Sequence, residues 1–102
     1  MSSSTSWDSR SGADSLSAAT RDLIRRDAAA IWHPFTQQSS WVEDEPIVVD
    51  RADGMAFWDT DGNRYLDGVS SLWVNVHGHN NPEINAAISA QLGRLDHTTF
   101  LG

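Results

Sequence analysis

The sequence contains neither cysteine nor lysine, and these two absences exclude several kinds of chemistry. Without cysteine the chain cannot form disulfides or thiolate metal sites, and we expect a cytoplasmic protein. All seven basic residues are arginine, so no side-chain amine is available to form a Schiff base. No apolar run is long enough to span a bilayer. The formal net charge of −7 disfavours nucleic acid and anionic membranes as partners, because both attract a positive surface.

The first residues are rich in serine and poor in apolar bulk, most of which comes from Trp7 and Leu16. Such a segment buries too little apolar surface to offset the entropy that is lost on ordering, so we predict a disordered tail over residues 1–19. Neither a signal peptide nor a transit peptide is predicted, because the segment is acidic and lacks a continuous apolar run. The remainder, residues 20–102, provides at most one domain.

Two helices are predicted from capping residues and from the spacing of apolar side chains. Thr20 is predicted as the N-cap of a helix that ends at His33, since Pro34 disfavours helical geometry in the residue before it. Asn81 is predicted as the N-cap of a second helix with Pro82 at its first position. One face of this second helix carries Ile84, Ala87, Ile88, Gln91, Leu92 and Leu95.

Three short strands are predicted between the helices, over residues 46–50, 55–59 and 64–67. Residues 52–54 are predicted to form a turn, and Asp61 with Gly62 favours a tight hairpin turn. The following segment, residues 69–76, is apolar with embedded serines and is predicted to be a buried connector. We therefore predict an α+β fold with an N-terminal helix, a small antiparallel β-meander and a following helix.

Several histidine and tryptophan residues are predicted to have structural rather than functional roles. His77 and His79 flank Gly78 and are predicted to make local hydrogen bonds around a tight turn, because their spacing is weak support for a metal site. Three tryptophans are assigned to structural positions: Trp32, Trp41 and Trp58. Because Trp58 alternates with Phe57 on a predicted strand, one of the two should face the core.

Three blocks of sequence resemble class III aminotransferases: residues 31–37, 59–79 and 92–102. The second block contains Asp-Gly-x-x-Tyr-x-Asp at residues 61–67, followed by His-Gly-His at residues 77–79. The Trp-His-Pro-Phe run at residues 32–35 makes the chain most similar to members of the family that act in biotin biosynthesis. The resemblance covers nearly everything outside the serine-rich tail.

The resemblance implies the N-terminal segment of a fold-type I enzyme that uses pyridoxal 5'-phosphate (PLP) and works as a homodimer. The implied reaction converts 8-amino-7-oxononanoate to 7,8-diaminononanoate, and the amino donor stays open between S-adenosylmethionine and lysine. The family holds PLP as a Schiff base on a lysine that these residues do not contain. We therefore expect the main cofactor anchors in later sequence and no transaminase activity from this chain alone.

The resemblance also implies six substrate-binding residues: Pro34, Phe35, Leu72, Trp73, Thr99 and Leu101. No catalytic or metal-binding residue is assigned. Phe35 stands where many members of the family have tyrosine, and Leu72 stands in a pair that is often Trp-Trp. Both departures bear on the choice of amino donor, since phenylalanine cannot donate a hydrogen bond. Without the resemblance, Trp73 and Phe35 are ordinary core aromatics.

Two other interpretations stay open. The chain is also compatible with another class III enzyme, such as an ω-amino acid transaminase. It is compatible, too, with a non-catalytic binding module that docks a partner through residues 69–76 and 81–92. An isolated piece of an enzyme should expose a large apolar surface, whereas an independent module should be monomeric and melt cooperatively.

Overall fold

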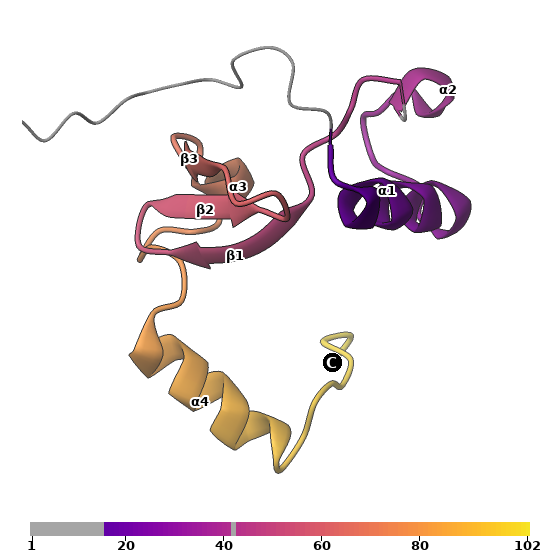
Figure 1. Cartoon of the computed structure of the whole chain (residues 1–102). Helices are drawn as coiled ribbons and strands as arrows, with labels where there is room; N and C mark the ends of the chain where they lie inside the picture. The colour runs from indigo at the N-terminus through magenta and orange to yellow at the C-terminus, as the bar shows by residue number, and fades with distance from the viewer. Residues whose placement is uncertain (1–15, 42) are drawn as a thin grey trace, which may run out of the picture. The chain divides into compact units, whose positions relative to one another are not determined.

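The computed structural model describes residues 16–41 and 43–102 and confirms the predicted α+β class (Figure 1). In chain order the elements are α1 (Ala18–Ala30), α2 (Gln38–Trp41), β1 (Val49–Asp53), β2 (Ala56–Asp59), β3 (Arg64–Leu66), α3 (Ser70–Trp73) and α4 (Pro82–Leu92). The chain divides into two compact units. Unit 1 runs to Val49 and includes Asp59–Asn63, and unit 2 comprises Asp50–Trp58 and Arg64–Gly102.

In unit 1, α1 begins three residues earlier than predicted. Ser17 is the N-cap, and its hydroxyl accepts the Thr20 N–H at 3.1 Å. The prediction of Thr20 as N-cap is wrong because Ser17 lies three residues upstream, in the position that reaches a first-turn amide. The helix ends at Ala30, ahead of the predicted His33. Of the tail predicted over residues 1–19, residues 1–15 lie outside the described residues, and α1 includes the last two.

Thr20 instead joins the start of α1 to the hairpin turn. Its side chain is 1% exposed, and its Oγ1 lies 2.7 Å from Thr60 Oγ1 and 3.0 Å from Asp61 Oδ1. Asp61 also accepts the Ser17 N–H at 3.3 Å. Hydrogen bonds from Ser17 and then Thr20 lower the pKa of Asp61 below its ordinary value. Beside this polar cluster, Ile24 is buried at 4% exposure.

A three-stranded sheet in the order β1–β2–β3 follows, and β1 and β2 run in opposite directions (Figure 1). β2 pairs antiparallel with β3, with Phe57 opposite Tyr65. The predicted hairpin turn is confirmed: Gly62 has φ +84° and donates its N–H to the Asp59 carbonyl at 3.0 Å. Asp59 closes the turn, since its buried carboxylate accepts the N–H groups of Asp61 and Asn63.

The first strand lies three residues later than predicted. Val48 uses its carbonyl to accept the Thr60 N–H at 2.9 Å, so it pairs with the hairpin turn. Gly54 exchanges both backbone hydrogen bonds with His79, at 3.1 and 2.7 Å. This pairing carries extended structure through residues 52–53, where a turn was predicted, because partners far along the chain override local turn preference.

The buried residues of β2 are Ala56 and Asp59, so the prediction that Phe57 or Trp58 faces the core is wrong. Ala56 is buried at 3% exposure, whereas both aromatics are half-buried. Phe57 stacks on Tyr65, with ring centroids 5.1 Å apart. The Trp58 ring lies 4.0 Å from the guanidinium carbon of Arg51, a cation–π contact that favours a partly solvated position.

α4 has the predicted caps. Asn81 accepts the N–H groups of Glu83 and Ile84 at 3.0 and 3.3 Å, with Pro82 at the first helical position. The large apolar residues of its predicted face are 41% to 60% exposed: Ile84, Ile88, Leu92 and Leu95. Among the described residues, the buried hydrophobic side chains are Ile24 and Ala56. No helix in the described part of the chain has the length and apolar character of a membrane span.

Candidate functional site

The most unusual backbone in unit 2 is the turn α3, which carries two of the predicted site residues. Its four residues, Ser70–Trp73, have φ values of 52°, 46°, 67° and 70°, all in the left-handed region. None of them is glycine, and each such residue costs about 1 kcal/mol or more. Strain of this kind persists only where surrounding contacts impose it, and it is concentrated at functional sites.

Asp67 supplies two of the contacts that hold this turn. One carboxylate oxygen accepts the Ser71 N–H at 3.0 Å, and the other accepts the Ser71 hydroxyl at 2.8 Å. These bonds, together with His79, lower the pKa of Asp67 from 3.8 to about 2. Backbone bonds complete the turn, since Trp73 N–H donates to the Val69 carbonyl at 2.9 Å.

His79 connects Asp67 to the rest of the connector. Its Nε2 lies 2.7 Å from Asp67 Oδ2, and its Nδ1 lies 2.6 Å from the Asn75 amide nitrogen. An amide nitrogen only donates, so with Asn75 oriented as it is here Nδ1 must accept and Nε2 must carry the proton. The Asp67 and His79 side chains are 6% and 17% exposed.

The His79 backbone anchors this network to the end of β1 through its two hydrogen bonds with Gly54. Gly78 makes the close approach possible: its φ is +78°, and a Cβ there would lie 3.2 Å from the Gly54 carbonyl oxygen. The predicted local hydrogen bonding around Gly78 is confirmed for the bond between His79 and Asn75, whereas Asp67 and Gly54 lie farther away in the sequence. A hollow of about 200 Å³ is lined by Gly54, Met55, Asp67, Ser70, Asn75, Val76, Gly78 and His79.

Leu72 and Trp73 lie side by side in the chain on this strained turn, and they are 65% and 81% exposed. The prediction of a buried connector over residues 69–76 is therefore wrong. Polar bonds to Asp67 and Ser70, rather than apolar burial, fix the connector. A hydrogen-bonded turn that presents two large apolar side chains to solvent has the features of a binding surface.

The other predicted site residues lie in two further exposed segments. Pro34 and Phe35 form a turn in unit 1, where Phe35 has φ 53° and the Pro34 carbonyl accepts the Thr36 hydroxyl at 2.9 Å. In unit 2, Thr99 Oγ1 accepts the Leu101 N–H at 3.1 Å. The two residues of each pair are near neighbours in the chain. The substrate contacts assigned to all six residues stay predictions.

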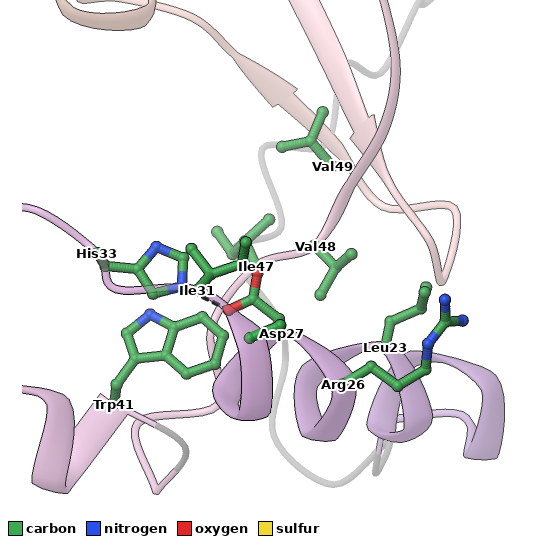
Figure 2. Close-up of a pocket in the computed structure, with 10 residues that line it drawn as sticks. Leu23, Arg26, Asp27, Ile31, His33, Trp41, Ile47, Val48 and Val49 are labelled. Carbon is green, nitrogen blue, oxygen red and sulfur yellow. Dashed lines mark hydrogen bonds and ion pairs between the residues drawn. The ribbon is translucent and has the colours of Figure 1, made fainter.

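Unit 1 contains a larger hollow, of about 540 Å³, whose residues are drawn in Figure 2. Asp27, His33 and Trp41 form a group at its edge (Figure 2). His33 Nε2 lies 2.5 Å from Asp27 Oδ2, and the His33 ring stacks on Trp41 at 4.5 Å between centroids. Trp41 therefore has the structural role predicted for it. Trp32, by contrast, is 88% exposed.

The sequence did not predict the network of Asp67, Ser71, Asn75 and His79. The one available signal was the spacing of four residues between Asp67 and Ser71, and between Asn75 and His79, which resembles ordinary helical spacing. The left-handed backbone of the turn, which brings these pairs together, has no signature in the sequence. Within residues 16–41 and 43–102, no cluster of three His, Asp or Glu side chains is placed to hold a metal ion.

Comparison with known proteins identifies the family. The model of the class III aminotransferases matches residues 37–102, so this chain belongs to the class III aminotransferase family. The adenosylmethionine-8-amino-7-oxononanoate aminotransferase of Nitratidesulfovibrio vulgaris is 59% identical over 83 residues, which are 81% of this chain and 15% of the relative. The enzyme of the same name from Staphylococcus aureus is 47% identical over 81% of this chain and 18% of its own length.

Solved structures agree with this assignment. The adenosylmethionine-8-amino-7-oxononanoate aminotransferase of Methanocaldococcus jannaschii matches 78% of this chain with a TM-score of 0.69 and 41% identity, over 18% of its own chain. An (S)-enantioselective ω-transaminase from Thermomicrobium roseum matches 88% of this chain with a TM-score of 0.71 and 34% identity, over 20% of its own chain. The predicted resemblance to the N-terminal part of a fold-type I PLP aminotransferase is confirmed. The chain spans less than a fifth of the curated relatives named above.

Proposed function

We propose that this chain forms one wall of the substrate pocket in a PLP-dependent aminotransferase that converts 8-amino-7-oxononanoate to 7,8-diaminononanoate in biotin biosynthesis. Relatives named for 8-amino-7-oxononanoate, at 59% and 47% identity, support this substrate over others. The assembly is a cytoplasmic homodimer in this proposal, and S-adenosylmethionine or lysine serves as the amino donor.

The observation that carries the proposal is the left-handed turn that exposes Leu72 and Trp73. The oxononanoate substrate has a long aliphatic chain with polar groups at its ends. A pocket for such a molecule needs apolar walls and a few polar groups that fix the ends. Leu72 and Trp73 supply apolar wall on a backbone that hydrogen bonds hold in place.

The residues of this chain do not make a complete PLP site. A lysine amine is needed for the Schiff base that holds the cofactor, and the sequence has none. This chain therefore binds and orients substrate in the proposal, and its residues carry no proton in the reaction. The 102-residue polypeptide alone is expected to show no transaminase activity.

A hybrid enzyme tests the proposal. The matching 83-residue segment of the N. vulgaris relative is replaced by that of this chain, and formation of 7,8-diaminononanoate is measured with each amino donor. The unaltered relative is assayed in parallel, and the hybrid is first shown to elute at the same size. A folded hybrid that makes the product supports the proposal. A folded hybrid that makes none contradicts it.

The second candidate is an ω-transaminase, the class named for the T. roseum enzyme, which is 34% identical to this chain. The same hybrid separates the two candidates when it is offered a simple ω-amine with a keto acid acceptor. Preference for the simple pair over 8-amino-7-oxononanoate, judged by kcat/KM, would favour the ω-transaminase.

A further inference from the structure

The side chains that hold the left-handed turn are largely buried, whereas the turn itself is exposed to solvent. Asp67 and His79 are 6% and 17% exposed, whereas Trp73 is 81% exposed. Asp67 receives three hydrogen bonds, two from Ser71 and one from His79. Because left-handed backbone is disfavoured in residues other than glycine, the hand of this turn depends on these bonds.

We propose that Asp67 and His79 are positioning residues: through Ser71, they fix the left-handed turn that presents Leu72 and Trp73 to the substrate. The inference rests on the proposed function, because the substrate is that of the proposed aminotransferase. Asp67 and His79 act on the backbone and touch no substrate in this account. Their removal therefore changes how the substrate fits.

The donor and acceptor balance explains why a carboxylate is needed at position 67. The carboxylate of Asp67 only accepts, and all three groups that face it donate: the Ser71 N–H, the Ser71 hydroxyl and the His79 Nε2–H. An asparagine has one accepting oxygen, and its NH₂ group would face a donor. Asp67→Asn keeps the size of the side chain and breaks this balance, so it tests the hydrogen bonding alone.

The first experiment is NMR spectroscopy of the folded hybrid enzyme described above, with ¹⁵N-labelled histidine and uniformly labelled samples, because the isolated chain exposes most of its large apolar side chains. Ring nitrogen shifts should show a proton on His79 Nε2, and strong intraresidue H–N to Hα contacts should show positive φ at Ser71 and Leu72. Asp67→Asn should abolish the positive φ. Asp53→Asn, the same change at an exposed carboxylate in β1, should preserve it.

Two results would overturn the proposed geometry. One is an Asp67→Asn hybrid that keeps positive φ at Ser71 and Leu72. The other is an unaltered hybrid in which His79 carries no proton on Nε2. Neither result depends on any enzymatic activity, so this experiment judges the positioning network even if the proposed function is wrong.

The second experiment measures steady-state kinetics of the hybrid enzyme described above. Asp67→Asn and His79→Ala should each lower kcat/KM for 8-amino-7-oxononanoate by roughly tenfold to a hundredfold, mostly through KM, since a displaced wall misaligns the substrate. The matched controls Asp53→Asn and His77→Ala replace exposed residues and should change kcat/KM less than about twofold.

A rescue separates positioning from general stability. Ser71 has φ 46° and ψ 50°, a conformation that glycine adopts at little cost. Adding Ser71→Gly to Asp67→Asn should therefore bring the raised KM part of the way back to that of the unaltered hybrid. A variant whose KM equals that of the controls, or a double variant with no recovery, would overturn the inference. An unaltered hybrid that makes no product would instead contradict the proposed function.

Discussion

Ser70→Gly should make the left-handed turn more stable, which is the opposite of what glycine usually does. Ser70 has φ 52°, where a residue with a side chain costs about 1–2 kcal/mol. Glycine removes that cost but loses about 0.5–1 kcal/mol through the greater freedom of the unfolded chain. The difference is a gain of about 0.5–1 kcal/mol, which corresponds to a two- to fivefold rise in hydrogen-exchange protection at ~25 °C.

The matched control is Ser89→Gly, the same substitution in the right-handed helix α4. There glycine should cost about 0.5 kcal/mol and lower the protection of the surrounding amides. For Ser70→Gly, the informative amides are those of Trp73 and Val74, which donate to Val69 and Ser70 at 2.9 and 3.0 Å. Native-state hydrogen exchange reports each local opening without a cooperative melt. Loss of protection in both variants would refute the left-handed assignment.

Three further predictions follow from single contacts. Thr20→Val should weaken the start of α1 by about 0.5–1.5 kcal/mol, because it removes the hydrogen bonds of the buried hydroxyl to Thr60 and Asp61. Thr20→Ser keeps the hydroxyl and should change protection of the α1 amides little. Gly78→Ala should destabilise its turn more than Gly62→Ala in thermal scans of the hybrid: both have positive φ, but only at Gly78 does a Cβ meet a carbonyl, at 3.2 Å. Asp67 has a folded pKa of about 2, below its ordinary 3.8, so the stability that its carboxylate adds is complete above pH 3.8 and is lost as the pH falls toward 2. Hydrogen exchange of the Trp73 amide should show this loss, and in Asp67→Asn the exchange should no longer depend on pH in this way.

Local chemistry was enough to predict α4 and the hairpin turn. Asn81 and Pro82 fix the start of α4 through caps that need no partner elsewhere in the chain. Gly62 likewise supplies the positive φ that the turn between β2 and β3 requires. The start of α1 was misjudged because Ser17 and Thr20 are equally good caps by residue type. The tertiary bonds of Thr20 to Thr60 and Asp61 decide between them.

The candidate site was only partly predictable. Family resemblance assigned Leu72 and Trp73 to the substrate pocket; both side chains are exposed, and the assignment stays a prediction. The left-handed hand of their turn was beyond prediction, since Ser, Leu and Trp have no preference for positive φ. It follows from the hydrogen bonds of Ser71 to Asp67, and Asp67 in turn bonds to His79. Pairings of this kind depend on the folded chain and leave no periodic pattern in the sequence.

The apolar surface of the described residues bears on the question of an independent module. Large hydrophobic side chains are exposed on α4 and on the connector, and the buried ones are Ile24 and Ala56. So small a core is marginal for independent folding. We expect the isolated 102-residue chain to self-associate in sedimentation velocity and to melt without a sharp transition. A monomer with a cooperative melt would favour the binding-module interpretation.

The central claim, that Leu72 and Trp73 on the strained turn form a wall of the substrate pocket, is tested most directly by one kinetic comparison. In the hybrid enzyme, Trp73→Ala is compared with Val74→Ala, which truncates an equally exposed apolar residue one position further on, where φ is −103°. We predict that Trp73→Ala raises KM for 8-amino-7-oxononanoate by at least about tenfold. Val74→Ala should leave KM unchanged. Equal KM values for the two variants would contradict the account.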